Sequence, residues 1–354
     1  MSSSDEDRPG VLFVTRKWAP ATGGMETYSL KLTDRLGKLT SLEIVALPGR
    51  SNGMPPGPLS LLLFPFTVLC RILSRPHAPE VLHLGDMALW PLRFLAGRKT
   101  RVVISAHGTD VAYHRRRGWR GRLYGLYLRL GARWSRDVLM IANSRATARV
   151  AAETGWKCDA TIPLATDFSS DESEISNDGT ILFAGRLVER KGMGWFVREV
   201  LPLLPGTLRL KVAGTGWDEA ERAALDHPRV EYLGALPPAQ LAAQYARSLC
   251  VIIPNIEVAT GEYEGFGLVA PEAASAGGVV LAADHGGLQD AVRHGRTGLL
   301  VETGNPDAWA QAIRAISKWS AAERESFIRD ARRLSREYYN WERVAEETVA
   351  LYCR

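Results

Sequence analysis

The sequence is poor in cysteine, and the few cysteines it has do not form a zinc-binding or disulfide-rich pattern. Its 354 residues include four cysteines, none in a C-x2-C arrangement, at Cys70, Cys158, Cys250 and Cys353. Scattered single cysteines are typical of a reduced, intracellular protein. The acidic opening MSSSDEDRPG contains no apolar stretch, so we expect no secretory signal and predict a cytoplasmic protein.

No apolar run is long enough to cross a membrane as a helix, which takes about 20 residues. The most apolar run, LSLLLFPFTVLCRIL, extends only over Leu59–Leu73 and is interrupted by Pro65. We therefore expect this segment to form a buried or interfacial helix.

The dinucleotide-binding pattern G-x-G-x-x-G is also missing. The nearest approach, AGTGWDE at residues 213–219, keeps two glycines, whereas the pattern uses three for the tight turn, the approach to pyrophosphate and the helix packing. A nicotinamide-dependent dehydrogenase is therefore disfavoured.

Charge is distributed unevenly along the chain. The formal net charge is +5, but residues 1–170 hold 24 Lys and Arg against 13 Asp and Glu, a net of +11, and residues 171–354 hold 20 against 26, a net of −6. The length suits two domains. The basic half predicts an anionic partner.

Short β-rich segments alternate with helical patterns in both halves. They predict five strands in the first half, within VLFVTRKW, LEIVAL, VLHLGD, RVVISAHGTD and VLMIANSR, and six in the second, within TILFAGRL, LRLKVAG, VEYLGAL, LCVIIPN, VVLAAD and GLLVE. Almost wholly apolar strands belong to parallel sheets covered by helices on both faces. The sequence thus predicts an α/β protein with two doubly wound, Rossmann-like domains facing a central cleft.

A polar segment separates the two halves. TDFSSDESEISNDGT, at residues 166–180, has almost no large apolar side chain and is typical of a linker. We expect an N-terminal domain at 1–168, a linker at 169–179, a C-terminal domain at 180–335 and a final helix at 336–354. The apolar stripe of that helix consists of Trp341, Val344, Ala345 and Val349.

Two cations follow a predicted strand in FAGRLVERKG. Arg186 comes directly after the strand and Lys191 five residues later, at the sheet edge where doubly wound domains bind ligands. A planar guanidinium and a lysine point charge suit a phosphate group. The alternative is a pair of solvated surface cations.

The segment GEYEGFGLVAPEAASAGG places Glu264 on a loop and Glu272 in the first turns of a predicted helix, in E-x7-E spacing. Pro271 supports a helix start nearby, and an exposed helix start binds anions while neighbouring carboxylates accept hydrogen bonds from sugar hydroxyls. The alternative is a helix whose first turn is acidic because of the helix dipole. The backbone expected to approach the ligand is that of Gly265, Phe266, Gly267, Leu268 and Val269.

The first half offers weaker signals, which lie at the corresponding edge of its own predicted sheet. Gly23 and Gly24 precede a helix in KWAPATGGMET, and His107 follows an apolar strand in SAHGTD, which ends at Asp110. Glycines at a helix start allow a phosphate or sugar to approach closely. A permissive turn and a structural histidine are the alternatives.

Taken together, these motifs resemble the retaining glycosyltransferases of the GT-B fold, of the family 4 (group 1) type. GGMET, HGTD, GRLVERKG and EGFGLVAPEAASAGG occur in that family's order, and VLAADHGGLQDAVRHGRTGLLVETGNPDAWAQAI is similar to its closing segment. The resemblance covers nearly the whole chain. It implies a nucleotide-sugar in the second domain, an acceptor in the first, and a terminal helix that crosses back to the first domain.

The resemblance also implies a role for each site residue. Glu272 holds the ribose hydroxyls, Glu264 contacts the donor sugar, Arg186 and Lys191 neutralise the diphosphate, and His107 lies near the reacting carbon. Gly23, Gly24, Asp110 and the residues 265–269 complete the donor site. No D-x-D follows a predicted strand, so we expect no metal and no cofactor beyond a UDP- or GDP-sugar co-substrate.

One departure from the family and two other functions stay open. The loop IEVATGEY before Glu264 is longer than usual for the family and contains Glu262, a competing carboxylate that breaks the E-x7-E spacing. A nucleotide-sugar epimerase of this fold and a catalytically degenerate binding subunit are the alternatives. The epimerase would consume donor without acceptor.

The segment YHRRRGWRGRLYGLYLRLGARWSR, residues 113–136, carries eight arginines and no acid. Leu123, Tyr127, Leu130 and Trp134 lie on one helical stripe, as in helices at anionic membrane surfaces. We expect a lipid-linked or glycan acceptor, an anionic membrane surface and no nucleic acid as partners, with peripheral attachment to the cytoplasmic membrane. A core-packed helix is the alternative. The arginines proposed for this contact are Arg115, Arg116, Arg117, Arg120 and Arg122.

Overall fold

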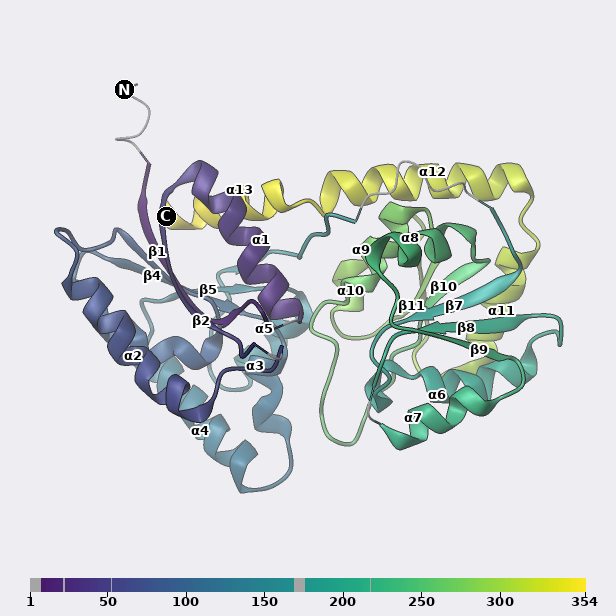
Figure 1. The fold of residues 1–354 in the computed structure, drawn as a ribbon, viewed down its shortest axis with the longest axis horizontal. Helices are drawn as coiled ribbons and strands as arrows, with labels where there is room; N and C mark the ends of the chain where they lie inside the picture. The colour runs from purple at the N-terminus through teal and green to yellow at the C-terminus, as the bar shows by residue number, and fades with distance from the viewer. Residues whose placement is uncertain (1–7, 22, 52, 169–175, 217) are drawn as a thin grey trace. The chain divides into compact units, whose positions relative to one another are not determined.

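The computed structural model describes residues 8–21, 23–51, 53–168, 176–216 and 218–354. The chain divides into two compact units (Figure 1). The first consists of Met1–Leu164 with Trp341–Arg354, and the second of Ala165–Asn340. Each is an α/β unit built on one parallel sheet of six strands, which confirms the predicted fold class.

The first unit has the strand order β2-β1-β3-β4-β5-β6. Its strands are β1 (Gly10–Trp18), β2 (Ser41–Pro48), β3 (Val81–Leu84), β4 (Arg101–Ala106), β5 (Leu139–Ala142) and β6 (Ala160–Thr161). Its helices are α1 (Gly24–Leu39), α2 (Pro58–Leu73), η1 (Met87–Leu95), α3 (Thr109–Ala112), η2 (Tyr113–Arg115), α4 (Trp119–Trp134), α5 (Arg145–Ala152) and α13 (Trp341–Tyr352). The sequence predicts all of these strands but β6, whose two residues are too few to show an apolar pattern.

The second unit has the strand order β12-β11-β10-β7-β8-β9. Its strands are β7 (Thr180–Ala184), β8 (Arg209–Ala213), β9 (Val230–Gly234), β10 (Cys250–Ile253), β11 (Val280–Ala283) and β12 (Leu299–Val301). Its helices are η3 (Glu189–Lys191), α6 (Met193–Trp195), η4 (Phe196–Val200), η5 (Leu201–Leu203), α7 (Glu219–Ala223), η6 (Ala224–Asp226), α8 (Pro238–Arg247), α9 (Val269–Ala276), α10 (Leu288–Ala291), α11 (Pro306–Ser317) and α12 (Ala321–Tyr338). All six predicted strands are present.

The central strands of both sheets are buried on both faces, as their apolar composition predicts. In the first unit Val11, Leu12, Phe13 and Val14 are fully buried, and in the second Ile181, Leu182 and Val251 are. The parallel register pairs Val11 with Val81 and Leu182 with Val251. The carboxyl ends of neighbouring strands therefore meet at one edge of each sheet.

The chain returns to the first unit at Trp341. Helix α13 packs against α1, and its inward side consists of Trp341, Val344, Ala345, Thr348, Leu351 and Tyr352. Inside the first unit, the Tyr352 hydroxyl lies 2.5 Å from Nδ1 of the buried His83, whose Nε2 lies 2.8 Å from Ser105 Oγ.

The unit boundaries fall at residues 164/165 and 340/341, whereas the sequence suggests 168 and 335. The difference arises because α12 continues as part of the second unit to its end. Ser335 hydrogen-bonds Ser275 at 3.0 Å, and the carbonyl of Tyr339 accepts a hydrogen bond from Thr166 N at 3.0 Å. Residues 169–175 of the expected linker lie outside the described residues.

Candidate active site

The charged motifs of the second unit meet where its strand order reverses. The chain places β8 and β9 on one side of β7 and then returns to place β10 on the other side. Doubly wound sheets bind ligands outside the carboxyl ends of the strands at such a point. Arg186 follows β7, and Asn255 follows β10.

Glu264 lies at the centre of this site and forms ion pairs with Arg190 and Lys191. Its Oε2 atom lies 2.7 Å from Arg190 Nη1 and 2.5 Å from Lys191 Nζ. Asn255 Nδ2 donates to the same oxygen at 3.1 Å. No other described residue hydrogen-bonds to Oε1, so one oxygen of Glu264 remains an available acceptor.

Burial and charge act in opposite directions on this cluster. Burial alone would raise the pKa of Glu264, but the charges of Lys191 and Arg190 lower it well below its usual range. Burial also lowers the pKa of Lys191, Glu264 opposes that effect, and the charges of Arg190 and Arg186 add to it. The cluster therefore holds closely spaced positive charge with one carboxylate as its counterion, an arrangement that favours a further anion.

The backbone of the predicted glycine-rich turn is folded tightly against the next loop. Gly287 N donates to the carbonyl of Glu264 at 2.8 Å. Gly267 has a φ of +95°, and a Cβ there would meet Leu288 Cδ2 at 2.5 Å. Only glycine suits this position, because the conformation is left-handed and the space is filled. Helix α9 then begins at Val269, with no side chain capping its start.

Glu272 lies in the first turn of α9, as predicted. Burial raises its pKa to about 7, an effect that Lys191 partly opposes. No described residue forms a hydrogen bond or an ion pair with its carboxylate. The two carboxylates of the E-x7-E pattern therefore differ: Glu264 is held ionised by cations, and Glu272 changes charge near neutral pH.

The first-unit residues lie at the carboxyl edge of their own sheet. His107 follows β4, its Nε2 lies 3.0 Å from the carbonyl of Gly85, and its ring packs edge-on against Tyr28. A donor at Nε2 makes Nδ1 an acceptor, and this buried nitrogen has no hydrogen-bond partner among the described residues. Nδ1 of His107 is therefore a buried acceptor that no described residue satisfies.

The Asp110 carboxylate accepts hydrogen bonds from backbone amides around His107. Its Oδ1 accepts from the amides of His107 and Gly108 at 2.9 and 3.0 Å, and its Oδ2 accepts from Met87 N at 3.2 Å. Both oxygens thus help to fix the turn that carries His107.

The remaining predicted residues are dispersed. Gly24 begins α1 after Gly23, beside the 3.5 Å ion pair of Lys17 and Glu26. Arg115 pairs with Glu153, and the guanidinium groups of Arg116 and Arg120 lie over aromatic rings. Arg117 and Arg122 are exposed.

Sequence reasoning missed four polar residues at these edges. Arg190 and Asn255 contact Glu264 in the second unit. In the first unit Arg16, at the end of β1, pairs with the fully buried Asp86 at 3.0 Å. The signal for Arg190 was present, since it directly precedes Lys191 in one short turn that ends at Gly192, whose φ is +70°.

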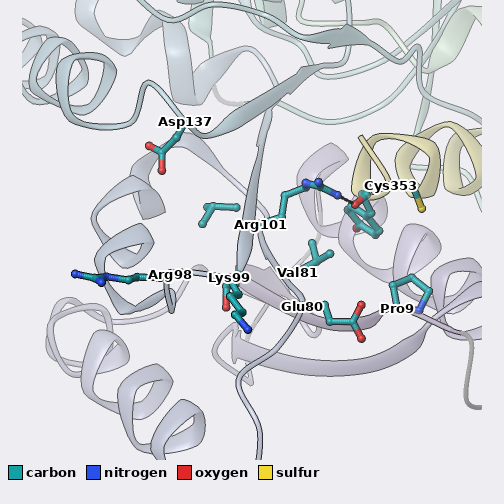
Figure 2. A pocket seen from close by; sticks show the side chains of 11 residues that line it. Pro9, Glu80, Val81, Arg98, Lys99, Arg101, Asp137 and Cys353 are labelled. Atoms are coloured by element: carbon teal, nitrogen blue, oxygen red, sulfur yellow. Dashed lines mark hydrogen bonds between the residues drawn. The ribbon is translucent and has the colours of Figure 1, made fainter.

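A recess at the opposite edge of the first sheet is not part of this site. Pro9, Glu80, Val81 and Arg101 line it at the amino ends of the strands, together with the end of α13 (Figure 2). Arg101 donates a hydrogen bond to the carbonyl of Tyr352 there, so its charge serves to hold α13.

No group of three or more His, Cys, Asp or Glu side chains in the described ranges is arranged to hold a metal ion. Among the described helices, none combines the length and the apolar character needed to cross a membrane.

Comparison with known proteins finds a family-model match within the second unit. Residues 178–318 match the family model described as glycosyl transferases group 1. Among curated proteins, an uncharacterized glycosyltransferase of Methanocaldococcus jannaschii is 33% identical over 180 residues, 49% of this chain and 44% of the relative. A D-inositol 3-phosphate glycosyltransferase of Nocardioides sp. is 33% identical over 196 residues, 49% of this chain and 41% of the relative. The matches thus span less than half of these relatives.

Solved structures share the fold over nearly the whole chain. HepE of Anabaena, in complex with UDP and glucose, has a TM-score of 0.71 with 17% identity, covering 97% of this chain and 99% of its own. A sucrose-phosphate synthase of Thermosynechococcus elongatus has a TM-score of 0.75 with 19% identity, covering 97% and 98%. These similarities show the GT-B fold that the sequence predicts.

Proposed function

We propose that the protein is a retaining glycosyltransferase that moves a sugar from a UDP- or GDP-linked donor to a lipid-linked or glycan acceptor, without a metal. The observation that carries this proposal is the buried cluster of Arg190, Lys191 and Glu264 at the switch point of β7 and β10. It lies inside residues 178–318, which match the family model described as glycosyl transferases group 1.

The cations of the cluster suit the diphosphate of a donor. As the bond between the sugar and the diphosphate breaks, its electron pair passes to a phosphate oxygen, and fixed positive charge close to that oxygen stabilises the transition state. Lys191 and Arg190 are already oriented by Glu264, and Arg186 adds a third charge at the same edge. No metal is needed to supply that charge.

The carboxylates suit the hydroxyl groups of the donor. Glu264 offers Oε1 to the sugar, and Glu272, once ionised, accepts from the ribose. Glu264 makes a poor nucleophile because its other oxygen is bound by two cations. A front-face reaction follows: the acceptor oxygen bonds to the sugar carbon on the side that the diphosphate leaves, and its proton passes to the departing phosphate oxygen.

The known relatives indicate which probes to use first. HepE is described in complex with UDP-glucose, and several curated relatives are D-inositol 3-phosphate glycosyltransferases. UDP and UDP-glucose are therefore the first donor probes and inositol phosphate the first soluble acceptor. The acceptor class we favour is a lipid-linked or polysaccharide precursor, as in the synthesis of lipopolysaccharide and other cell-surface glycans, reached at a membrane surface from the cytoplasm.

Equilibrium binding of UDP, GDP and NAD tests the proposal directly. We expect one of the uridine or guanosine nucleotides to bind, and an Arg186→Ala/Lys191→Ala variant to lose most of that affinity. A Lys318→Ala/Arg329→Ala variant removes two exposed cations of the same unit that form no described ion pair, and serves as the matched control. Binding of neither nucleotide to folded protein would overturn the proposal and favour a degenerate subunit.

A second assay separates transfer from epimerisation. Incubation with the donor alone should leave the sugar nucleotide unchanged apart from slow hydrolysis, and addition of acceptor should release the nucleoside diphosphate. Conversion of the donor sugar to its epimer without acceptor would identify an epimerase instead.

A further inference from the structure

Helix α2 presents an apolar face away from the protein. Of its 16 residues only Phe64 and Val68 are buried. Five large apolar side chains are between 51% and 73% exposed: Leu59, Leu62, Leu63, Phe66 and Leu73. A contiguous exposed apolar face of this kind marks an interaction surface, because scattered single side chains would not gather on one side of a helix.

Helix α4 is oriented the same way, with its small residues inward. Its buried positions are Gly121, Gly125, Leu128 and Gly131. A Cβ at Gly131 would meet Trp156 Cζ2 at 2.7 Å, so the helix lies close to the protein through its glycines. The side chains left outside, between 50% and 69% exposed, are Trp119, Leu123, Leu126 and Trp134. Of the four residues of the predicted stripe, Leu123 and Trp134 are therefore exposed, and Tyr127 and Leu130 are half-buried.

The two helices form one surface of the first unit. Both contact η1, and they are drawn on the same side of the unit in Figure 1. The 59% exposed Phe94 of η1 lies 6.4 Å from the ring of Trp134. On the α4 side a groove of about 550 Å³ is lined by Tyr113, Trp119, Leu123, Tyr124, Leu126 and Tyr127. We call this set the α2–α4 surface.

Positive charge borders the apolar side chains. Arg122, Arg129 and Arg133 follow one another at helical spacing along one side of the α4 stripe, and all three are exposed. Neither α2 nor α4 contains an acidic residue. The surface thus combines an apolar centre with a basic border.

We propose that the α2–α4 surface docks on an anionic lipid bilayer, with the apolar faces of α2 and α4 among the acyl chains and the arginines at the headgroups. Apolar helix faces bordered by arginine lie in the plane of such an interface. A second copy of the chain is a less suitable occupant because it would bring the two arginine rows together, and like charges oppose association. This docking stands on the first unit alone; only its use, to meet a lipid-linked acceptor, rests on the proposed function.

Vesicle cosedimentation tests the docking. We expect the protein to bind vesicles of phosphatidylcholine with phosphatidylglycerol more strongly than phosphatidylcholine alone, and binding to weaken with salt. A Leu62→Ser/Phe66→Ser variant should lose binding to both vesicles, and Arg122→Glu/Arg129→Glu should lose the preference for anionic lipid. The matched controls, Leu30→Ser/Leu39→Ser on α1 and Lys318→Glu/Arg329→Glu in the second unit, should bind like the wild type.

A label on α2 gives a readout that requires no change to the apolar face. Cys70 and Cys353 are both exposed, so an environment-sensitive dye is attached at Cys70 in a Cys353→Ser protein and at Cys353 in a Cys70→Ser protein. The dye at Cys70 should shift to the blue with anionic vesicles, and the dye at Cys353 should not. An unchanged Cys70 signal overturns the proposal, as does a dimer in solution that Leu62→Ser/Phe66→Ser converts to monomer.

UDP and GDP binding on the same samples separates the two proposals. Vesicle binding without nucleotide binding would support the docking proposal and contradict the proposed function. Nucleotide binding without vesicle binding would support the proposed function and contradict the docking proposal.

Discussion

Glu264 acts as the counterion of the candidate active site. Its removal should lower the free energy of unfolding, and a bound nucleotide should restore part of that loss. In a Glu264→Gln variant, Arg190 and Lys191 lie buried without their carboxylate, and loss of one partner of a buried pair costs about 3 kcal/mol. We expect this loss in the free energy of unfolding from denaturant titration, together with loss of sugar transfer. UDP should recover more stability in the variant than in the wild type, because the diphosphate replaces the missing charge.

Glu262 provides the matched control for this prediction. It lies two residues away in the same loop but outside the E-x7-E spacing. Equal effects of Glu262→Gln and Glu264→Gln on stability and transfer would contradict the roles assigned here.

Glu272 makes stability depend on pH in the opposite sense from an ion-paired carboxylate. Burial raises its folded pKa to about 7 from an ordinary 4.5. Between these values the unfolded chain has released the proton and the folded protein still holds it, so stability falls as pH rises, by about 1.4 kcal/mol per unit. Glu272→Gln should therefore melt higher than the wild type at pH 8 and no higher at pH 5.

The same substitution should weaken nucleotide binding at pH 8, where the ionised carboxylate accepts from the ribose. Wild-type binding should strengthen between pH 6 and 8 and the variant's should not. A variant that bound UDP normally at pH 8 would show that Glu272 does not contact the nucleotide.

At the scale of single residues, sequence patterns found the side chains that stand in a motif and missed those that meet only in the fold. Glu264, Lys191 and His107 follow predicted strands within recognisable patterns. Asn255 reaches Glu264 because β10 returns beside β7, and Arg16 meets Asp86 because β1 lies beside β3. Neither pair of neighbouring strands can be predicted from the local sequence.

At the scale of elements, the sequence predicted a helix at α4 but could not decide which of its faces points inward. Trp119, Leu123 and Leu126 fit either a core or a lipid surface by their spacing. The structure decides through Gly121, Gly125 and Gly131, whose lack of a side chain allows close contact with the protein. A row of glycines opposite a row of large apolar residues is the signal that could have settled the orientation.

Helix α13 is attached to the first unit by a buried hydrogen bond that can be removed alone. Tyr352→Phe leaves Nδ1 of His83 without its partner in a fully buried setting, which costs about 1–3 kcal/mol. We expect this decrease in chemical denaturation followed by signals of the first unit. The exposed Tyr232, whose hydroxyl donates to the carbonyl of Gly214 at 2.9 Å, is the control, and a loss as large in Tyr232→Phe would contradict the argument.

At the scale of the whole molecule, the two units should respond separately to a nucleotide. Each has its own sheet and its own core, and the proposed donor site lies in the second. We expect UDP to slow hydrogen exchange within residues 185–192 and 264–276 and to leave the strands of the first sheet unchanged. A ligand present at 100 times its Kd stabilises the unit that binds it by about 2.7 kcal/mol. Protection confined to the first unit would reject the assignment.

The first unit is completed by residues that the ribosome adds after the whole of the second unit. Trp341, Leu351 and Tyr352 fill its core, whereas the second unit is one uninterrupted stretch from Ala165 to Asn340. During translation the second unit can close while the first still lacks α13, so the amino-terminal half matures last. A chain that stalls before residue 341 lacks Trp341 and Tyr352, whose rings lie against Tyr28 and His83 in the folded unit.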